Sequence, residues 1–147
     1  MPLKASLQKD HIPTNKFSMF VLGMPNFAFV YVSGLEEEID MVDLPDRTRA
    51  SGGNTQPIEF TVRHPLHHTL EHAALEVWFN ENKDPISLTA KKIATLTMLS
   101  GSGATSRTYT LLGVWPSKRK LPDLEFENEG EMALTEWTFQ ADSMLPI

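Results

Sequence analysis

Hydrophobic and polar residues alternate along much of this chain, which is the pattern of β-strands that bury one face. Two β-rich runs, at 17–22 and 27–35, flank the turn-type sequence Gly-Met-Pro-Asn at 23–26 and predict a hairpin. Residues 91–99 and 105–115 flank the sequence Ser-Gly-Ser-Gly-Ala and predict a second hairpin. Strands therefore dominate both ends of the sequence.

Two further predicted strands have a defined inward face. Over 56–63 apolar and polar residues alternate, and the inward positions are Ile58, Phe60 and Val62. A Pro-containing connection leads to a last strand within 132–142, whose shared face consists of Ala133, Thr135, Trp137, Phe139 and Ala141. The resulting count of six or seven strands predicts a mainly β fold.

Residues 35–42 also alternate, but one face of this predicted strand is acidic. Leu35, Glu37, Ile39 and Met41 lie on one side, and Glu36, Glu38, Asp40 and Val42 lie on the other. An acidic strand face is ordinarily a solvated surface. It suggests a function only if the fold places it on the concave wall of a cavity or channel. The following residues, 43–55, are polar and charged and show no apolar period of either kind, which predicts a long flexible loop.

One helix is predicted, over 65–82. Pro65 suits the first helical turn, and a single apolar stripe recurs at spacings of three and four through Leu66, Leu70, Ala73, Ala74 and Val77. This stripe is predicted to face the core. The opposite face, with His68, Glu71 and His72, is then directed toward solvent or a neighbouring subunit.

The helix carries a possible metal motif, since His68-Thr69-Leu70-Glu71-His72 spells the H-x-x-E-H signature of one class of zinc peptidase. Two histidines one turn apart can share a metal, with Glu71 as a general base. A catalytic zinc also needs a third ligand and an orienting second shell, and no second His or Glu helix offers them. A small zinc hydrolase is therefore only a remote alternative. We assign no catalytic, cofactor-binding or metal residue, and no enzyme activity or cofactor is expected.

Composition narrows the class of protein. The 147 residues, 41% hydrophobic and 22% charged, suit one domain, 1–147, and the absence of cysteine excludes disulfides and thiolate metal sites. The formal net charge of −6 argues against a protein that grips nucleic-acid phosphates, although DNA could still slide past it. Neither a long apolar run nor a signal-peptide core occurs, so we expect a chain that stays in a cytoplasm and binds no membrane.

Two long stretches, one in each half of the chain, together form a pattern that neither forms alone. The first, KFSMFVLGMPNFAFVYVSGLEEEID, leads from aromatic runs into Val-Ser-Gly-Leu-Glu at 32–36. The second, GVWPSKRKLPDLEFENEGEMALTEWTFQADSM, contains Trp115-Pro116, Lys118 and the loop sequence Leu-Pro-Asp-Leu at 121–124 before a last alternating strand. In this order, separated by a central helix, they span 16–144 and resemble phage tail tube proteins of the contractile-tail, myophage type. That family is related to the tubes of contractile injection systems.

Two features depart from the family pattern. The glycine- and lysine-containing stretch that often follows the long loop is represented here only by GGNTQPIEFTVRH. The histidines on the helix are not part of the pattern.

The resemblance implies a β-sandwich or barrel-like subunit with one flanking helix, whose hairpins form a β-barrel between subunits. Such subunits stack as hexameric rings into a hollow conduit for genome delivery, in a virion tail assembled in the host cytoplasm. The implied partners are a tail sheath, a baseplate or tube initiator, a tail terminator and a tape measure protein, while DNA passes without specific binding. The inner tube of a type VI secretion or bacteriocin-type system, which shares the fold without the DNA cargo, is the alternative.

The resemblance also implies roles for three surfaces and the N-terminal arm, 1–15, which is expected to reach an adjacent ring. The predicted loop 43–55 is expected to contact the next ring through Asp46, Arg47, Arg49, Gly52 and Gly53. The helix and a short basic run are expected to face a sheath, the basic residues being Lys118, Arg119 and Lys120. The acidic strand face is expected to line the lumen and repel DNA through Glu36, Glu38 and Asp40. The alternative register places Glu37 inside, because a shift of one residue reverses every side chain.

Overall fold

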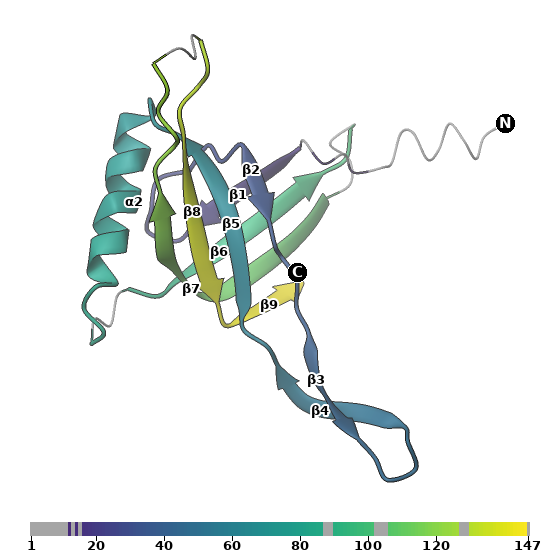
Figure 1. Cartoon of the computed structure of the whole chain (residues 1–147). Helices are drawn as coiled ribbons and strands as arrows, with labels where there is room; N and C mark the ends of the chain where they lie inside the picture. The colour runs from purple at the N-terminus through teal and green to yellow at the C-terminus, as the bar shows by residue number, and fades with distance from the viewer. Residues whose placement is uncertain are drawn as a thin grey trace, which may run out of the picture.

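The computed structural model of the chain describes residues 12, 14, 16–86, 90–101, 106–126 and 130–146 (Figure 1). Within them it has one helix, α2 (Thr69–Glu81), and nine strands. The strands are β1 (Phe17–Val21), β2 (Tyr31–Ser33), β3 (Ile39–Asp43), β4 (Arg49–Thr55), β5 (Ile58–Pro65), β6 (Lys92–Leu99), β7 (Ser106–Lys120), β8 (Leu134–Ala141) and β9 (Ser143–Pro146). The predicted fold class is confirmed. The predicted N-terminal arm lies almost wholly outside the described residues.

Strand β7 joins two groups of strands that cross one another (Figure 1). Its first part pairs with β6 on one side and β9 on the other, and its last part, from Trp115, pairs with β8. The sheet order is β1-β6-β7-β8-β5-β2. The predicted hairpin of 91–99 and 105–115 is confirmed, but β7 continues through Lys120, where the sequence predicted a connection. A bulge between Pro116 and Lys118 lets the strand pass a residue that has no N–H to donate.

The core lies between the two groups of strands and beneath α2. The predicted inward residues of β5, Ile58, Phe60 and Val62, are all buried, as are Trp137 and Phe139 of β8. The rings of Phe60 and Phe139 stack with centroids 5.4 Å apart. Burial of an apolar side chain of this size stabilises the fold by about 1.5–3 kcal/mol. The two strands with the clearest alternation therefore form the centre of the fold.

The first predicted hairpin is wrong. Strand β1 pairs with β6, with Phe17 opposite Met98, and β2 pairs with β5, with Tyr31 opposite Arg63. Only one isolated bridge, between Met19 and Phe27, joins the two runs. The chain does turn at 23–26, but burial of Phe27 and then of Phe29 directs it into the core before it reaches β5.

The predicted flexible loop at 43–55 is also wrong, because β3 and β4 form a hairpin that is a separate two-stranded sheet. It projects from the body of the subunit in Figure 1. The predicted strand at 35–42 begins only at Ile39. Most residues of the hairpin are exposed on both faces, so no buried side imposes a period of two on the sequence. Gly52 permits close pairing, since a Cβ there would lie 3.0 Å from the carbonyl oxygen of Asp40.

Helix α2 forms as predicted but begins four residues later, and a different face of it packs on the core. Pro65 is the last residue of β5 rather than part of a helical turn. Of the predicted inward stripe, Leu70 is 84% exposed and Val77 is 60% exposed. Leu75 and Trp78 are buried instead, and the indole Nε1 of Trp78 donates a hydrogen bond of 2.5 Å to the carbonyl of Ala90.

The reason for this difference is side-chain volume. Apolar residues occur on every side of α2, so spacing alone does not select a face. The largest of them fill the space above β8, where the Trp78 ring lies 5.3 Å from that of Phe139 and the Phe79 ring lies 5.9 Å from that of Trp137. The helix presents its bulkiest face to the sheet.

Gly34, in the Val-Ser-Gly-Leu-Glu stretch, has a structural reason for being glycine. Its φ is +86°, and a Cβ there would lie 2.8 Å from the carbonyl oxygen of Glu59. Both conditions exclude other residues without strain. The chain can therefore pass close to the backbone of β5 as it leaves β2, and the exposed acidic residues 36–38 follow. No helix in the described part of the chain is long and apolar enough to cross a membrane.

Candidate functional site: assembly surfaces and a histidine cluster

Hairpin β3–β4 exposes a set of large apolar side chains. The exposed fractions are 53% for Ile39, 59% for Met41, 48% for Val42 and 41% for Leu44. Ile39, Met41 and Val42 lie on β3, and Leu44 lies in the turn after it. In the described part of the chain β3 and β4 pair only with each other, so the body of the subunit does not cover these side chains. An apolar set on a projecting element is typical of a surface that contacts another protein.

The tip of this hairpin is a structured turn. Asp46 accepts hydrogen bonds from the backbone N–H of Thr48 at 3.1 Å and from its hydroxyl at 2.6 Å, and the side-chain bond to Thr48 is the larger cause of a lowered pKa of Asp46. Arg47 adopts a left-handed conformation with φ 70°, and Arg49 forms an exposed ion pair of 3.1 Å with Asp43. All five residues expected to contact the next ring, Asp46, Arg47, Arg49, Gly52 and Gly53, lie on this hairpin and its turn.

The acidic residues lie at the base of the hairpin. Glu36 and Glu38 are exposed and line a shallow hollow together with Glu59 of β5. Asp40 is half-buried and accepts a hydrogen bond from the side-chain amide of Gln56. The structure therefore brings Glu36 and Glu38 together, places Asp40 on the hairpin, and adds Glu59, an outward position of the predicted strand 56–63.

Glu37 lies apart from this acidic hollow. Its carboxylate accepts a hydrogen bond of 3.2 Å from the backbone N–H of Met144, in β9. Alternation along the segment is therefore preserved, with Glu36 and Glu38 on one side and Glu37 on the other.

The basic run at the end of β7 is exposed but not uniform. Arg119 forms an ion pair with Glu76 of α2 and lies 5.2 Å from the ring centre of Phe79. Lys118 and Lys120 are exposed beside it. Arg119 is thus tied to the helix, whereas the two lysines are free to face outward.

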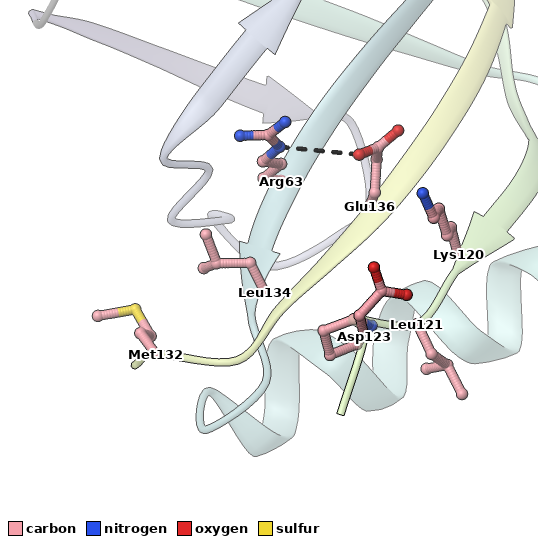
Figure 2. A pocket seen from close by; sticks show the side chains of 8 residues that line it. Arg63, Lys120, Leu121, Asp123, Met132, Leu134 and Glu136 are labelled. Atoms are coloured by element: carbon pink, nitrogen blue, oxygen red, sulfur yellow. Dashed lines mark ion pairs between the residues drawn. The ribbon is translucent and has the colours of Figure 1, made fainter. Parts of the chain in front are cut away.

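Lys120 borders the hollow shown in Figure 2. Arg63 and Glu136 form an ion pair of 3.7 Å across its floor, and Asp123 and Met132 contribute to its rim. Its mixed charges and partly apolar rim suit contact with a polar protein surface.

The histidine motif is arranged differently from the sequence prediction. His68 and Glu71 were expected on the solvated face, but their side chains are only 33% and 18% exposed and lie against His64, which is completely buried. Glu71 lies 2.6 Å from Nδ1 of His68 and 3.5 Å from Nε2 of His64. His72 instead approaches Glu76, with 3.4 Å between Nε2 and Oε1. The pair of histidines in H-x-x-E-H therefore does not converge on one point.

Burial and hydrogen bonding act on the charges of this histidine cluster, which consists of His64, His68 and Glu71. Burial lowers the pKa of His64, and the Glu71 carboxylate only partly offsets this effect. Burial raises the pKa of Glu71, but hydrogen bonds from His68 and from the backbone N–H of Ala28, with the His64 charge, together hold it below its ordinary value. The Glu71 carboxylate is therefore stabilised in its charged form, beside a buried imidazole whose charged form burial disfavours.

The sequence pattern of one protein family covers nearly the whole chain. The model of the T4-like virus tail tube protein gp19 matches residues 13–144. This chain belongs to the tail tube family. The resemblance noted in the sequence is confirmed, and the family is one of structural tube proteins. No curated protein matches the chain.

Solved structures show that the tail tube fold is shared. A chain from the sheath–tube complex of an extracellular contractile injection system in its extended state has a TM-score of 0.76 at 20% identity, with 97% of this chain and 96% of that chain covered. A chain from the tube-terminating cap of the anti-feeding prophage gives 0.75 at 19% identity, covering 93% and 91%. Hcp1 from Flavobacterium johnsoniae gives 0.53 at 15% identity, covering 88% and 94%.

Three exposed features of the described chain carry the residues that the sequence assigned to contacts or to the lumen. These are the hairpin β3–β4, the acidic hollow, and the edge formed by α2 with the end of β7. Sequence reasoning placed residues on all three, but it missed Glu59, the apolar side chains of the hairpin as a contact surface, and His64.

Proposed function

We propose that this chain is the repeating subunit of a hollow tube in which hexameric rings stack along an axis. The observation that carries the proposal is the hairpin β3–β4, with its four exposed apolar side chains. A two-stranded ribbon is only marginally stable alone in water, and it gains stability when a third element covers it. A neighbouring subunit that packs on Ile39, Met41 and Val42 supplies that element.

The edges of the main sheet support the same proposal. Strands β1 and β2 are the two ends of the strand order, so each has an edge without a full strand partner in the described part of the chain. Open edges are templates for pairing with another chain. Pairing of such edges around a ring closes a β-barrel between subunits, and a closed barrel has no edges left.

The acidic hollow is proposed to line the lumen. Glu36, Glu38 and Glu59 lie close together at the base of the hairpin, with Asp40 next along the chain. Duplex DNA carries one negative charge per about 1.7 Å of its axis, so it is repelled by a wall of carboxylates. Rings of such residues keep the cargo from binding to the wall, and the conduit works by repulsion rather than by recognition.

We propose DNA as the cargo, because the matching family is that of a virus tail tube. The likeness to chains of extracellular contractile injection systems favours the alternative, an inner tube that delivers a cargo other than DNA. Purified particles distinguish the two, since nuclease-protected DNA supports a phage tail and its absence supports the alternative.

The outer surface is proposed to include the end of β7. Replacing Lys118 and Lys120 with glutamate is expected to prevent co-assembly with the sheath while tubes still form, because charge reversal changes a rim contact without touching the core. Co-sedimentation of tube and sheath measures the effect, and Arg107→Glu, at an exposed position at the opposite end of β7, is the matched control. Unchanged co-assembly of the double variant would contradict the assignment of Lys118 and Lys120 to a sheath contact.

Negative-stain electron microscopy of the purified chain tests the proposal as a whole. Rings or tubes with a central hole are the expected result. A monodisperse monomer at high concentration would contradict it.

A further inference from the structure

His64 is a charged-type side chain buried in the core of the described chain. It is fully buried at the end of β5; its Nδ1 has no hydrogen-bond partner in the described part of the chain, and its Nε2 lies 3.5 Å from Glu71 Oε1, at the limit of a hydrogen bond. The edges of Phe27 and Phe29 surround it, with ring centroids 6.2 and 5.9 Å away. A buried polar group without a partner is costly, so native structures rarely keep one without a role.

Two further ligand-type side chains face His64. The imidazole of His68 and the carboxylate of Glu71 offer one atom each, and these atoms and a ring nitrogen of His64 all lie within 4.8 Å of one another. The three residues come from the end of β5, the residue before α2 and the first turn of α2. Both His68 and Glu71 are partly exposed, so an ion can reach the cluster from solvent.

We propose that His64, His68 and Glu71 bind one divalent transition-metal ion, best fitted by Zn²⁺, as a structural clamp within the subunit. Two imidazole nitrogens and one carboxylate oxygen are a donor set that zinc favours. Zinc–ligand bonds of about 2.0–2.2 Å separate tetrahedral ligand atoms by about 3.3–3.5 Å. His64 Nε2 lies 3.5 Å from Glu71 Oε1, which fits this separation, and His68 Nδ1 lies 2.6 Å from the other carboxylate oxygen, Oε2. A rotation of the Glu71 carboxylate, with a small opening of its contact with His68, would bring one oxygen to the ion.

The surroundings of the cluster also fit a metal site. Glu71 Oε1 accepts a hydrogen bond of 2.6 Å from the backbone N–H of Ala28, which fixes the carboxylate as an outer-shell contact would. A metal held there ties the start of α2 to β5, beside the segment that holds Ala28. Because His64 is enclosed by phenylalanine rings, the clamp is structural.

This assignment differs from the zinc-peptidase interpretation of H-x-x-E-H at three residues. His72 is not a ligand, since it faces Glu76, and Glu71 is a ligand rather than a general base. The added ligand is His64, which lies outside the motif. All three proposed ligands belong to one subunit, so a failure of zinc binding would not contradict the proposed tube assembly, and a failure of assembly would not contradict zinc binding.

The test uses the full chain without a histidine tag. Zinc content by mass spectrometry, titration calorimetry with Zn²⁺ alone, and thermal unfolding with and without Zn²⁺ are compared across variants. His68→Gln and Glu71→Gln remove proposed ligands at partly exposed positions, so the fold is expected to survive. His67→Gln and His72→Gln are matched controls that remove neighbouring imidazoles.

The wild type and both controls are expected to bind one zinc per chain. A hundredfold excess of Zn²⁺ over its Kd is expected to raise Tm by about 5–10 °C. His68→Gln and Glu71→Gln are expected to bind at least about tenfold more weakly and to lose most of that rise. The proposal is overturned if the wild type neither binds zinc nor gains stability, if all variants bind equally, or if His72→Gln loses binding while Glu71→Gln keeps it.

Discussion

Replacement of Met41 with aspartate is expected to abolish tube assembly while leaving the subunit folded. Met41 is 59% exposed in the isolated subunit, so the new carboxylate is solvated there and costs the fold little. In the proposed tube the same position is covered by a neighbour, where an unpaired charge costs about 3 kcal/mol or more, or a hundredfold or more in affinity per contact. The contact repeats in every subunit, so assembly is expected to fail completely.

Sedimentation velocity and electron microscopy measure this assembly, and circular dichroism reports the fold. Met41→Leu keeps the apolar contact and is expected to form tubes. Asn54→Asp adds the same charge at an exposed polar position of the same hairpin and is expected to weaken assembly much less. Normal tubes from Met41→Asp would show that the hairpin is not an assembly contact.

The second large effect is expected in the core. Phe139→Ala removes a ring that stacks on Phe60 and also contacts Trp78 and Phe29, with centroid distances of 5.4, 5.3 and 6.5 Å. These contacts join β8 to β5, α2 and the segment before β2. Truncation of a buried phenylalanine costs about 3–5 kcal/mol, because the cavity collapses only partly. For a domain of this length, Tm is then expected to fall by about 6–20 °C.

Denaturant unfolding in the Met41→Asp background measures this loss on a monomer. Phe139→Leu keeps most of the volume and is expected to cost less than about 1.5 kcal/mol. Phe126→Ala, at a fully exposed ring, is expected to change stability by less than about 0.5 kcal/mol. A loss below about 1 kcal/mol for Phe139→Ala would contradict the proposed centre of the core.

The strands that the sequence predicted correctly are those with one buried face. In β5 and β8 the core imposes a period of two, and Ile58, Phe60 and Trp137 show it directly. Hairpin β3–β4 has no buried face, so β4 was predicted as part of a loop, although most of β3 lies within the predicted strand 35–42. The partner of β1 was missed for another reason. The turn at 23–26 can be recognised from neighbouring residues, whereas the pairing of β1 with β6 depends on contacts between residues that are far apart in the sequence.

The face of α2 was predicted wrongly because hydrophobic spacing counts residues rather than volume. Ala73 and Ala74 extended the predicted apolar stripe, but their side chains are small. The larger side chains of Leu75 and Trp78 are the ones buried when the helix packs on β8. The histidine cluster was missed because its ligands come from two elements. The sequence nevertheless contained an indication. His64 follows Ile58, Phe60 and Val62 at every second position of β5, so its side chain is expected to point into the core, where a buried imidazole needs partners.

The most direct measurement is a cryo-electron microscopy map of the tube assembled from this chain. A hollow tube of stacked six-fold rings is expected, with β3–β4 of each subunit packed against a neighbour and the carboxylates of Glu36 and Glu38 on the inner wall. A map with these carboxylates on the outer wall would contradict the proposed lumen, and a chain that forms no ring or tube would contradict the proposed function itself.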